Sequence, residues 1–174
     1  DPVAVNVPVN AGASFTDPGV LDTHTAGWDW GDGTTTAGTV SEASSSGSVS
    51  DSHAYSVPGI YLISLIVADK DGGTAESFFE YVVIYDPNGG FVTGGGWIDS
   101  PAGAYTADLS LSGKATFGFV AKYQKGANTP VGNTEFQFRV GGLNFKSTLY
   151  EWLVVAGDKA QFKGVGTING EGEY

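Results

Sequence analysis

The sequence contains no cysteine and no methionine. Without cysteine, neither disulfide bonds nor thiolate chemistry is available to the protein. The absence of methionine leads us to expect a processed product or an excised piece of a longer protein. Basic residues are few, eight against 19 acidic residues, and the formal net charge is −11 at pH 7. A chain this acidic repels phosphate groups, so nucleic acid is not expected as a partner.

Long apolar stretches are missing as well. No run approaches the length of a membrane span, the N-terminus lacks a signal-peptide pattern, and no stretch shows the three- and four-residue apolar spacing of a helix. The chain instead has 27 glycines and 13% aromatic residues, with many serines and threonines. This composition is typical of short strands joined by many turns, so we expect an all-β fold.

The acidic charge belongs to one half of the chain. Residues 1–86 contain one lysine and 12 acidic residues, whereas residues 87–174 contain seven basic and seven acidic residues. The change falls at Asp86-Pro87-Asn88-Gly89-Gly90, where proline and glycine interrupt any regular element. The sequence therefore predicts two units, residues 1–86 and residues 87–174.

The first half is organised around Gly27-Trp28-Asp29-Trp30-Gly31-Asp32-Gly33, which reads as a strand running into a tight turn. Trp28 and Trp30 alternate, so both side chains fall on one face of that strand. Two large aromatic side chains on one face predict the centre of a β-sandwich core.

This motif resembles the signature of PKD domains, which are extracellular, immunoglobulin-like β-sandwiches. Three further matching pieces follow the same order, namely Phe15-Thr16-Asp17-Pro18-Gly19, His53-Ala54-Tyr55, and Pro58-Gly59-Ile60-Tyr61 leading into a strand that ends near Asp69-Lys70-Asp71-Gly72. The resemblance covers residues 1–86. It implies a spacer or adhesion module of surface and secreted proteins rather than a catalyst.

The second half shows strict two-residue alternation. Residues 115–123 and 136–140 each place apolar side chains on one face, so we expect them to pair as antiparallel neighbours in a β-meander. Phe91–Ile98, Gly118-Phe119-Val120 and Glu151–Val155 resemble a β domain that follows PKD repeats in bacterial exported proteins. Since that domain continues beyond the position of Tyr174, we expect an open edge strand. Residues 3–7 of another copy could pair with it and build a filament.

The search for catalytic motifs is negative. Only His24 and His53 could act as imidazole bases, and neither a Gly-x-Ser-x-Gly motif nor zinc-ligand spacing is present. His53 occupies a position of the PKD pattern, for which we expect a structural hydrogen-bonding role. The chain is therefore predicted not to be an enzyme.

Calcium is the cation that the acidic turns could bind, because Ca²⁺ prefers six to eight oxygen ligands from carboxylates and carbonyls. The candidate ligands are Asp17, Asp22, Asp29, Asp32, Asp69 and Asp71. The alternative is that these aspartates are solvated turn residues that cap their own backbone. Both interpretations remain open from the sequence.

Exposed aromatic rings could stack on sugars, and the candidates are Trp97, Tyr105, Tyr150 and Trp152. The alternative is that these rings belong to the core. We expect an extracellular or cell-surface module of bacterial type with a structural or adhesive role in a surface, matrix or filament-forming protein. Its partners would be further copies or other surface proteins. The second hypothesis is a carbohydrate-binding accessory module of a secreted hydrolase, with polysaccharide as the partner.

Overall fold

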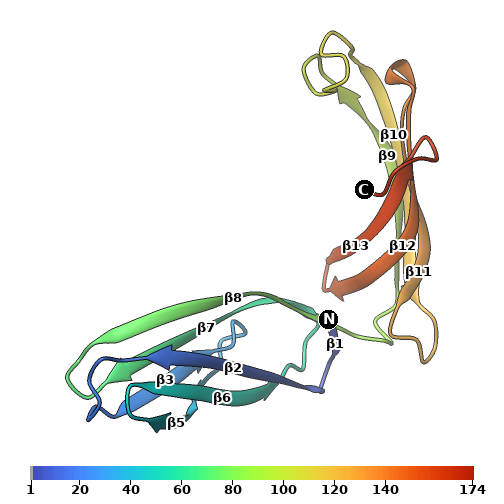
Figure 1. The fold of residues 1–174 in the computed structure, drawn as a ribbon. Helices are drawn as coiled ribbons and strands as arrows, with labels where there is room; N and C mark the ends of the chain where they lie inside the picture. The colour runs from blue at the N-terminus through green and yellow to red at the C-terminus, as the bar shows by residue number, and fades with distance from the viewer. Residues whose placement is uncertain (1) are drawn as a thin grey trace. The chain divides into compact units, whose positions relative to one another are not determined.

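The computed structural model describes residues 2–174, without the side chain of Glu80. The chain forms two compact units that divide between Ile84 and Tyr85. Both units are built from strands, and the described residues contain one short 3₁₀ helix (Figure 1). The all-β fold expected from the composition is confirmed.

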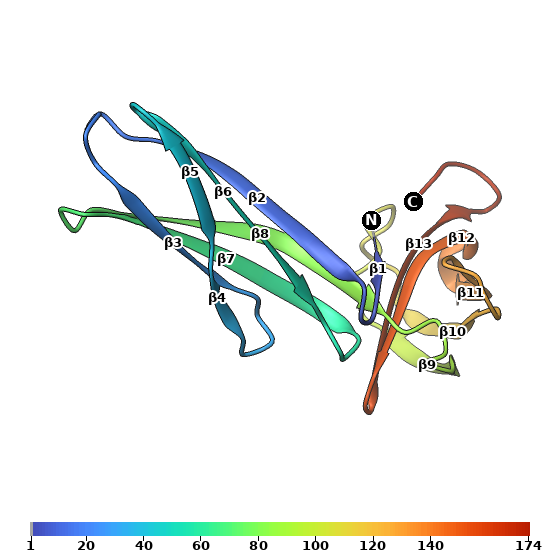
Figure 2. The ribbon, with the colours of Figure 1, turned by 90° about the horizontal axis from the view of Figure 1, so that it is seen from below.

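The first unit consists of two sheets, one of five strands and one of three. The five-stranded sheet has the order β1 (Val3–Ala4), β8 (Thr74–Tyr85), β7 (Gly59–Asp69), β3 (His24–Asp29) and β4 (Thr35–Ala37). The three-stranded sheet has the order β2 (Pro8–Thr16), β6 (Ser46–Ala54) and β5 (Thr39–Ala43). Figure 2 shows β2, β5 and β6 lying across β3, β7 and β8. This two-layer arrangement is an immunoglobulin-like β-sandwich.

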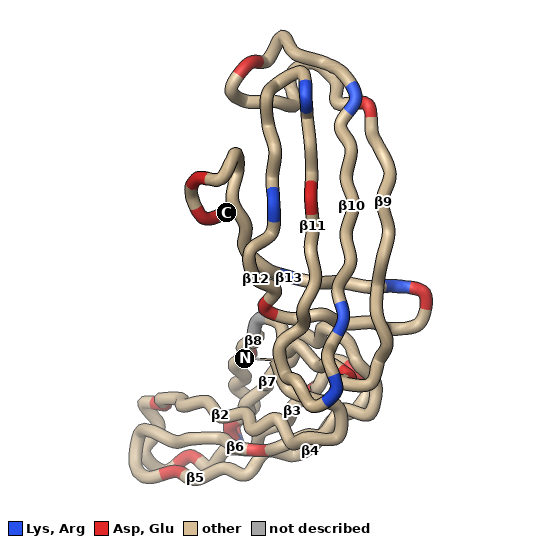
Figure 3. The backbone as a smooth tube through the Cα atoms, turned by 90° about the vertical axis from the view of Figure 1, so that its right-hand side faces the viewer, with Lys and Arg blue, Asp and Glu red and all other residues tan. Residues whose placement is uncertain are grey.

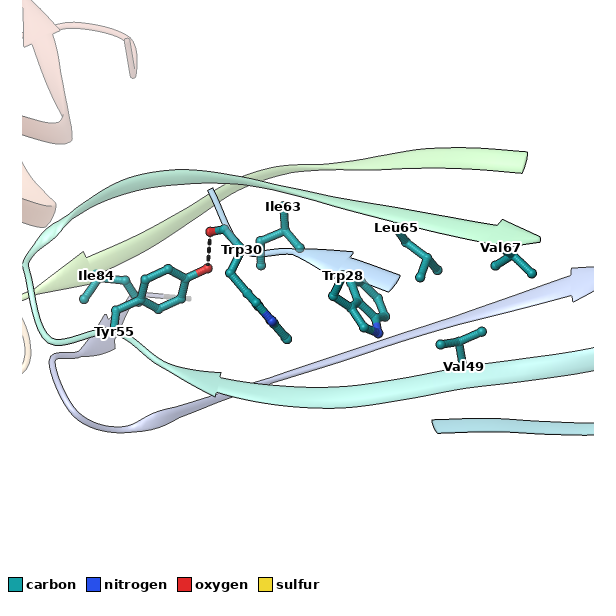
Figure 4. Packing of buried hydrophobic residues seen from close by; sticks show 8 residues of the cluster. All are labelled: Trp28, Trp30, Val49, Tyr55, Ile63, Leu65, Val67 and Ile84. Atoms are coloured by element: carbon teal, nitrogen blue, oxygen red, sulfur yellow. Dashed lines mark hydrogen bonds between the residues drawn. The ribbon is translucent and has the colours of Figure 1, made fainter. Parts of the chain in front are cut away.

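Two-residue alternation positions the core of this sandwich. On β7, Ile63, Leu65 and Val67 are buried, while Leu62 and Ile66, at alternate positions of the strand, are exposed. The inward side chains meet Trp28 and Trp30 of the neighbouring strand and loop and Val49 of the facing sheet (Figure 4). The tryptophan-centred core predicted from the sequence is confirmed.

The N-terminal segment already has partners within its own unit. β1 is an edge strand of the five-stranded sheet, beside β8. The Asn6 N–H then donates a 2.8 Å hydrogen bond to the Tyr55 carbonyl oxygen. Donation of residues 3–7 to another copy would have to break this pairing, so the structure gives that hypothesis no support.

The second unit contains a single antiparallel sheet in which each strand pairs with the next along the chain (Figure 1). Its strands are β9 (Phe91–Ser100), β10 (Gly113–Tyr123), β11 (Pro130–Phe138), β12 (Leu143–Ala156) and β13 (Lys159–Ile168), with the 3₁₀ helix η1 (Arg139–Gly141) after β11. β10 and β11 pair as the antiparallel neighbours expected from the sequence, in a register that places Phe117 opposite Phe136. The predicted meander is confirmed.

One face of this sheet is apolar. Its buried centre is Ala121, Tyr150 and Leu153, and Phe162 of β13 packs against that centre. On the same face, the Phe119 ring packs against Gly94. A β-carbon added to Gly94 would lie only 2.7 Å from an atom of that ring. An aromatic ring thus covers the glycine backbone of β9, a recognised way of stabilising glycine in an edge strand.

The two outer strands of this sheet differ. β9 pairs with β10 and has no other partner among the described strands. The last part of β13 is covered, since Gly166 and Tyr174 exchange two backbone hydrogen bonds of 3.0 and 2.9 Å and Ile168 bridges to Glu171. The freer edge of the second unit is therefore β9.

Candidate functional site

The tryptophan motif forms the structural centre of the first unit. The Trp28 and Trp30 rings stack with centroids 5.7 Å apart, and the Trp30 Nε1–H donates a 2.8 Å hydrogen bond to the Thr36 hydroxyl. The Tyr55 hydroxyl donates a 2.8 Å hydrogen bond to the Trp30 carbonyl oxygen (Figure 4). Burial raises the pKa of the Tyr55 hydroxyl, so that group remains a donor at physiological pH. These contacts connect the turn after β3 to the facing sheet.

His53 completes this centre. Its Nε2 lies 2.8 Å from the Asp32 carboxylate, and its ring stacks on Trp30 with centroids 5.1 Å apart. Burial acts to raise the pKa of Asp32, but hydrogen bonds from Thr34 and His53 outweigh it and hold that pKa below the ordinary value. His53 therefore has the structural hydrogen-bonding role expected from its position.

Gly31 is required where the motif turns. Its φ is +75°, and a β-carbon there would lie 2.3 Å from the Leu62 carbonyl oxygen. Gly33 also has positive φ, +91°, but a β-carbon there would meet nothing within 4 Å. Gly31 is thus needed both for its positive φ and for the close approach of the Leu62 backbone, whereas Gly33 is needed for its positive φ alone.

A second histidine site was not predicted from the sequence. The His24 Nε2 lies 2.9 Å from the Asp17 carboxylate, and its Nδ1 lies 2.7 Å from the Glu42 carboxylate. The hydrogen bond with Glu42 is the main cause that raises the pKa of His24, with a further contribution from Asp17, while burial acts against it. Because His24 begins β3 and Glu42 lies in β5, this cluster joins the two sheets.

The His24 cluster predicts a pH dependence of stability. Its folded-state pKa is raised, so its contribution is fully present below about pH 6.5, the unfolded value, and is lost as the pH rises through the raised folded value. We expect His24→Gln to reduce the urea unfolding free energy of the first unit more at about pH 5.5 than at about pH 8.5. An equal reduction at both pH values would contradict the assignment.

The six candidate calcium ligands are not gathered into one site. Asp17 contacts His24, Asp32 contacts His53, and Asp22 and Asp71 both contact Lys70. Among the side chains that the structure describes, which exclude Glu80, no group of three or more acidic, histidine or cysteine residues is placed to hold a metal ion.

The remaining two aspartates cap their own turns. Asp29 accepts a 2.9 Å hydrogen bond from the Gly31 N–H, and Asp69 accepts 2.7 and 2.9 Å bonds from the N–H groups of Asp71 and Gly73. These backbone hydrogen bonds lower the pKa of Asp69, whereas burial acts against them. Asp29 and Asp69 thus cap their own backbone in this structure, and calcium binding by the acidic turns stays a prediction.

The four candidate aromatic residues have different environments. Trp97 is 57% exposed, and the Lys114 ammonium lies 4.5 Å from its ring centroid. Tyr105 and Trp152 are half-buried, and the Tyr105 ring meets Phe138 edge-on with centroids 5.7 Å apart. Tyr150 is only 4% exposed and its hydroxyl contacts Thr134, so its prediction as a sugar-stacking residue is wrong.

Comparison with known proteins finds one family model that is similar to the first unit. The family model of the PKD domain matches residues 1–83, and the match ends next to the division at Ile84. PKD domains are non-catalytic, immunoglobulin-like modules typical of extracellular proteins, which suggests an extracellular structural or adhesive module in general. No curated protein and no solved structure matches the chain. Among the described residues, no helix is long and apolar enough to cross a membrane.

Proposed function

We propose that the chain is a non-catalytic structural and adhesive module of a bacterial surface, matrix or filament-forming protein, and that it associates through the free edge of β9. The sandwich of the first unit acts as the spacer that its family match suggests. The second unit supplies the joining surface.

The observation that carries this proposal is the open edge of β9. This strand is ten residues long and pairs on one side only, with β10. An unpaired edge presents N–H and C=O groups that a strand of another chain can satisfy. Phe91 and Ile98, near its two ends, are 64% and 50% exposed. A long, exposed, apolar-ended edge is a template for strand pairing between chains.

The charge of the two units supports the same assignment. The −11 net charge belongs to the first half of the chain, whereas the basic and acidic residues of the second half are equal in number. The second units of two copies can therefore approach without net repulsion. Since the end of β13 is covered by residues 171–174, pairing of β9 with β9 of a second copy is the arrangement that the free edges favour. Such pairing uses the same surface on both copies and closes as a dimer.

Charged substitutions on β9 test the proposal. Phe91→Lys combined with Ile98→Lys should prevent association, because two copies would bring four ammonium groups to one junction. Sedimentation velocity over a range of protein concentrations should show dimers for the natural sequence and monomers for this variant.

A matched control adds the same charge elsewhere. Val20 and Leu21 are 60% and 85% exposed in the first unit, so Val20→Lys with Leu21→Lys removes exposed apolar surface without touching β9. This control should remain dimeric. The proposal would be contradicted by a natural sequence that is monomeric at every concentration, or by a β9 variant that still dimerises.

A further inference from the structure

The polar face of the second sheet contains a hollow built by strand register. Three cross-strand rows lie side by side on β9, β10 and β11, because directly opposite residues of antiparallel strands share a face. In the order β9, β10, β11 the rows are Trp97, Thr116 and Gln137; Gly95, Gly118 and Glu135; and Thr93, Val120 and Asn133. The middle row therefore has no side chain on two adjacent strands.

Because the middle row lacks side chains on β9 and β10, a hollow forms on this face of the sheet. Neighbouring rows are about 7 Å apart along the strands, so side chains of the outer rows form two walls over a glycine floor. Thr93, Thr116, Val120, Asn133, Glu135 and Gln137 line a hollow of about 440 Å³, together with Gly118 and its neighbours on β10. That volume lies within the range of small-molecule binding sites. Glu135 lies at one end of the hollow, and at the other end β9 is the edge strand of the sheet. In a single copy the hollow is therefore a short groove that opens at the β9 edge.

The chemistry of the walls is polar and nearly neutral. Among the described residues, the side chains of Asn133, Gln137 and Thr116 form no hydrogen bond with other residues, so their amides and hydroxyl are available to a ligand. Amides and hydroxyls both donate and accept hydrogen bonds. Glu135 is balanced by Lys146, 3.5 Å away. Figure 3 shows that the middle of β9 and β10 carries no charged residue.

An exposed aromatic ring adjoins this groove. Trp97 lies directly opposite Thr116 of the wall, and 57% of its surface is exposed. The Lys114 ammonium on the same side of the sheet lies over the Trp97 ring, 4.5 Å from its centroid, so a sugar would stack on the opposite face of the indole. The indole gives the groove an apolar platform at the sheet edge.

We propose that this groove binds a neutral polysaccharide chain. A sugar ring presents hydroxyl groups that match the amides and hydroxyls of the walls, and an apolar C–H face that stacks on the Trp97 ring. The near balance of charge in the groove favours a neutral glycan over an acidic one. An extended peptide is less well matched, because the walls offer no apolar pocket for its alternate side chains. The inference does not depend on dimerisation through β9.

Filling the groove tests this inference with little risk to the fold. A β-carbon on Gly118 would meet only the Gly94 carbonyl oxygen, at 3.9 Å, which is an ordinary contact. Valine suits a strand, so Gly118→Val should keep the sheet intact while its side chain occupies the floor. Trp97→Ala removes the stacking platform, and the exposure of this ring makes a folding defect unexpected.

The experiment measures depletion binding to cellulose, chitin, mannan and β-1,3-glucan, with alginate as an acidic comparison. The natural sequence should bind at least one neutral polysaccharide and bind alginate more weakly. Gly118→Val and Trp97→Ala should each weaken that binding at least about tenfold. Gly27→Val introduces the same side chain on the first unit, at a position where a β-carbon meets nothing within 4 Å, and should leave binding unchanged.

Three results would overturn the inference. One is that the natural sequence binds none of the four neutral polysaccharides. Another is that Gly118→Val and Trp97→Ala bind as tightly as the natural sequence, with unchanged melting temperatures. The third is that Gly118→Val abolishes dimerisation but not glycan binding, which would make the groove a protein interface. The polysaccharide-binding measurement is repeated with the Phe91→Lys, Ile98→Lys variant, which is expected to be monomeric. Its result therefore tests glycan binding by the groove separately from the proposed dimer.

Discussion

Trp28→Ala is expected to destabilise the first unit by about 3–5 kcal/mol, the usual cost of truncating a buried aromatic side chain. The side chain is 1% exposed and lies against Trp30 and Phe79, with ring centroids 5.7 and 5.5 Å away. Removing it leaves a cavity between the two sheets that neighbouring strands, held by their hydrogen bonds, cannot fill. A domain with a stability of only about 5 kcal/mol would be left with about 0–2 kcal/mol, close to its unfolding midpoint.

Differential scanning calorimetry checks this result unit by unit. The transition of the first unit should be lost or shifted to much lower temperature, while the second unit keeps its own transition. Trp97→Ala is the matched control, because this tryptophan is 57% exposed and belongs to the second unit. If the natural sequence unfolds in a single transition and Trp28→Ala abolishes it, the two units do not fold independently.

Gly132→Ala is expected to have the largest effect on the second unit. A β-carbon there would lie 1.9 Å from the Val120 carbonyl oxygen and 2.9 Å from the Ala121 α-carbon. These are backbone atoms of β10, so β10 and β11 would have to separate at the centre of the meander. Overpacking of this kind costs about 1–3 kcal/mol and occasionally more.

Gly118→Ala provides the comparison for this substitution. It adds the same methyl group to the adjacent strand, where the contact with the Gly94 carbonyl oxygen is 3.9 Å. Urea unfolding of the second unit should show a large loss of stability for Gly132→Ala and little change for Gly118→Ala. Equal midpoints for the two variants would contradict the close approach of β10 and β11.

Short-range patterns predicted much of the fold. The alternation of Trp28 and Trp30 indicated one buried face, and both side chains are buried. The alternation of residues 115–123 and 136–140 indicated paired strands, and the observed register places Phe117 opposite Phe136. In each case the prediction depends on the two-residue period of a strand and on the turn residues beside it. Both can be recognised within a few positions of the chain.

Tyr150 shows where simple alternation fails. The register of β12 and β13 shifts between Ser147 and Leu149, and again between Tyr150 and Trp152. Each shift changes which residues of β12 face the apolar side of the sheet. The sequence around Tyr150 has no proline or glycine to indicate such a shift. The sequence therefore left both interpretations of this ring open, and the structure places it in the buried centre.

The His24 cluster shows a second limit of sequence analysis. Asp17 and Glu42 are seven and 18 positions from His24, and Glu42 lies in the other sheet. No local spacing indicates that these three side chains meet. The groove on β9 to β11 has the same origin, because Gly95 and Gly118 become neighbours only through the register of two strands.

The proposal that β9 joins two copies is tested most directly by amide hydrogen exchange of residues 91–100 at several protein concentrations. Strand pairing would slow exchange at the outward N–H groups of β9 as dimers form, while exchange in β10, which is paired on both sides, would stay the same. We predict protection in β9 that rises with protein concentration and disappears in the Phe91→Lys, Ile98→Lys variant. Exchange in β9 that is independent of concentration would contradict the proposed association.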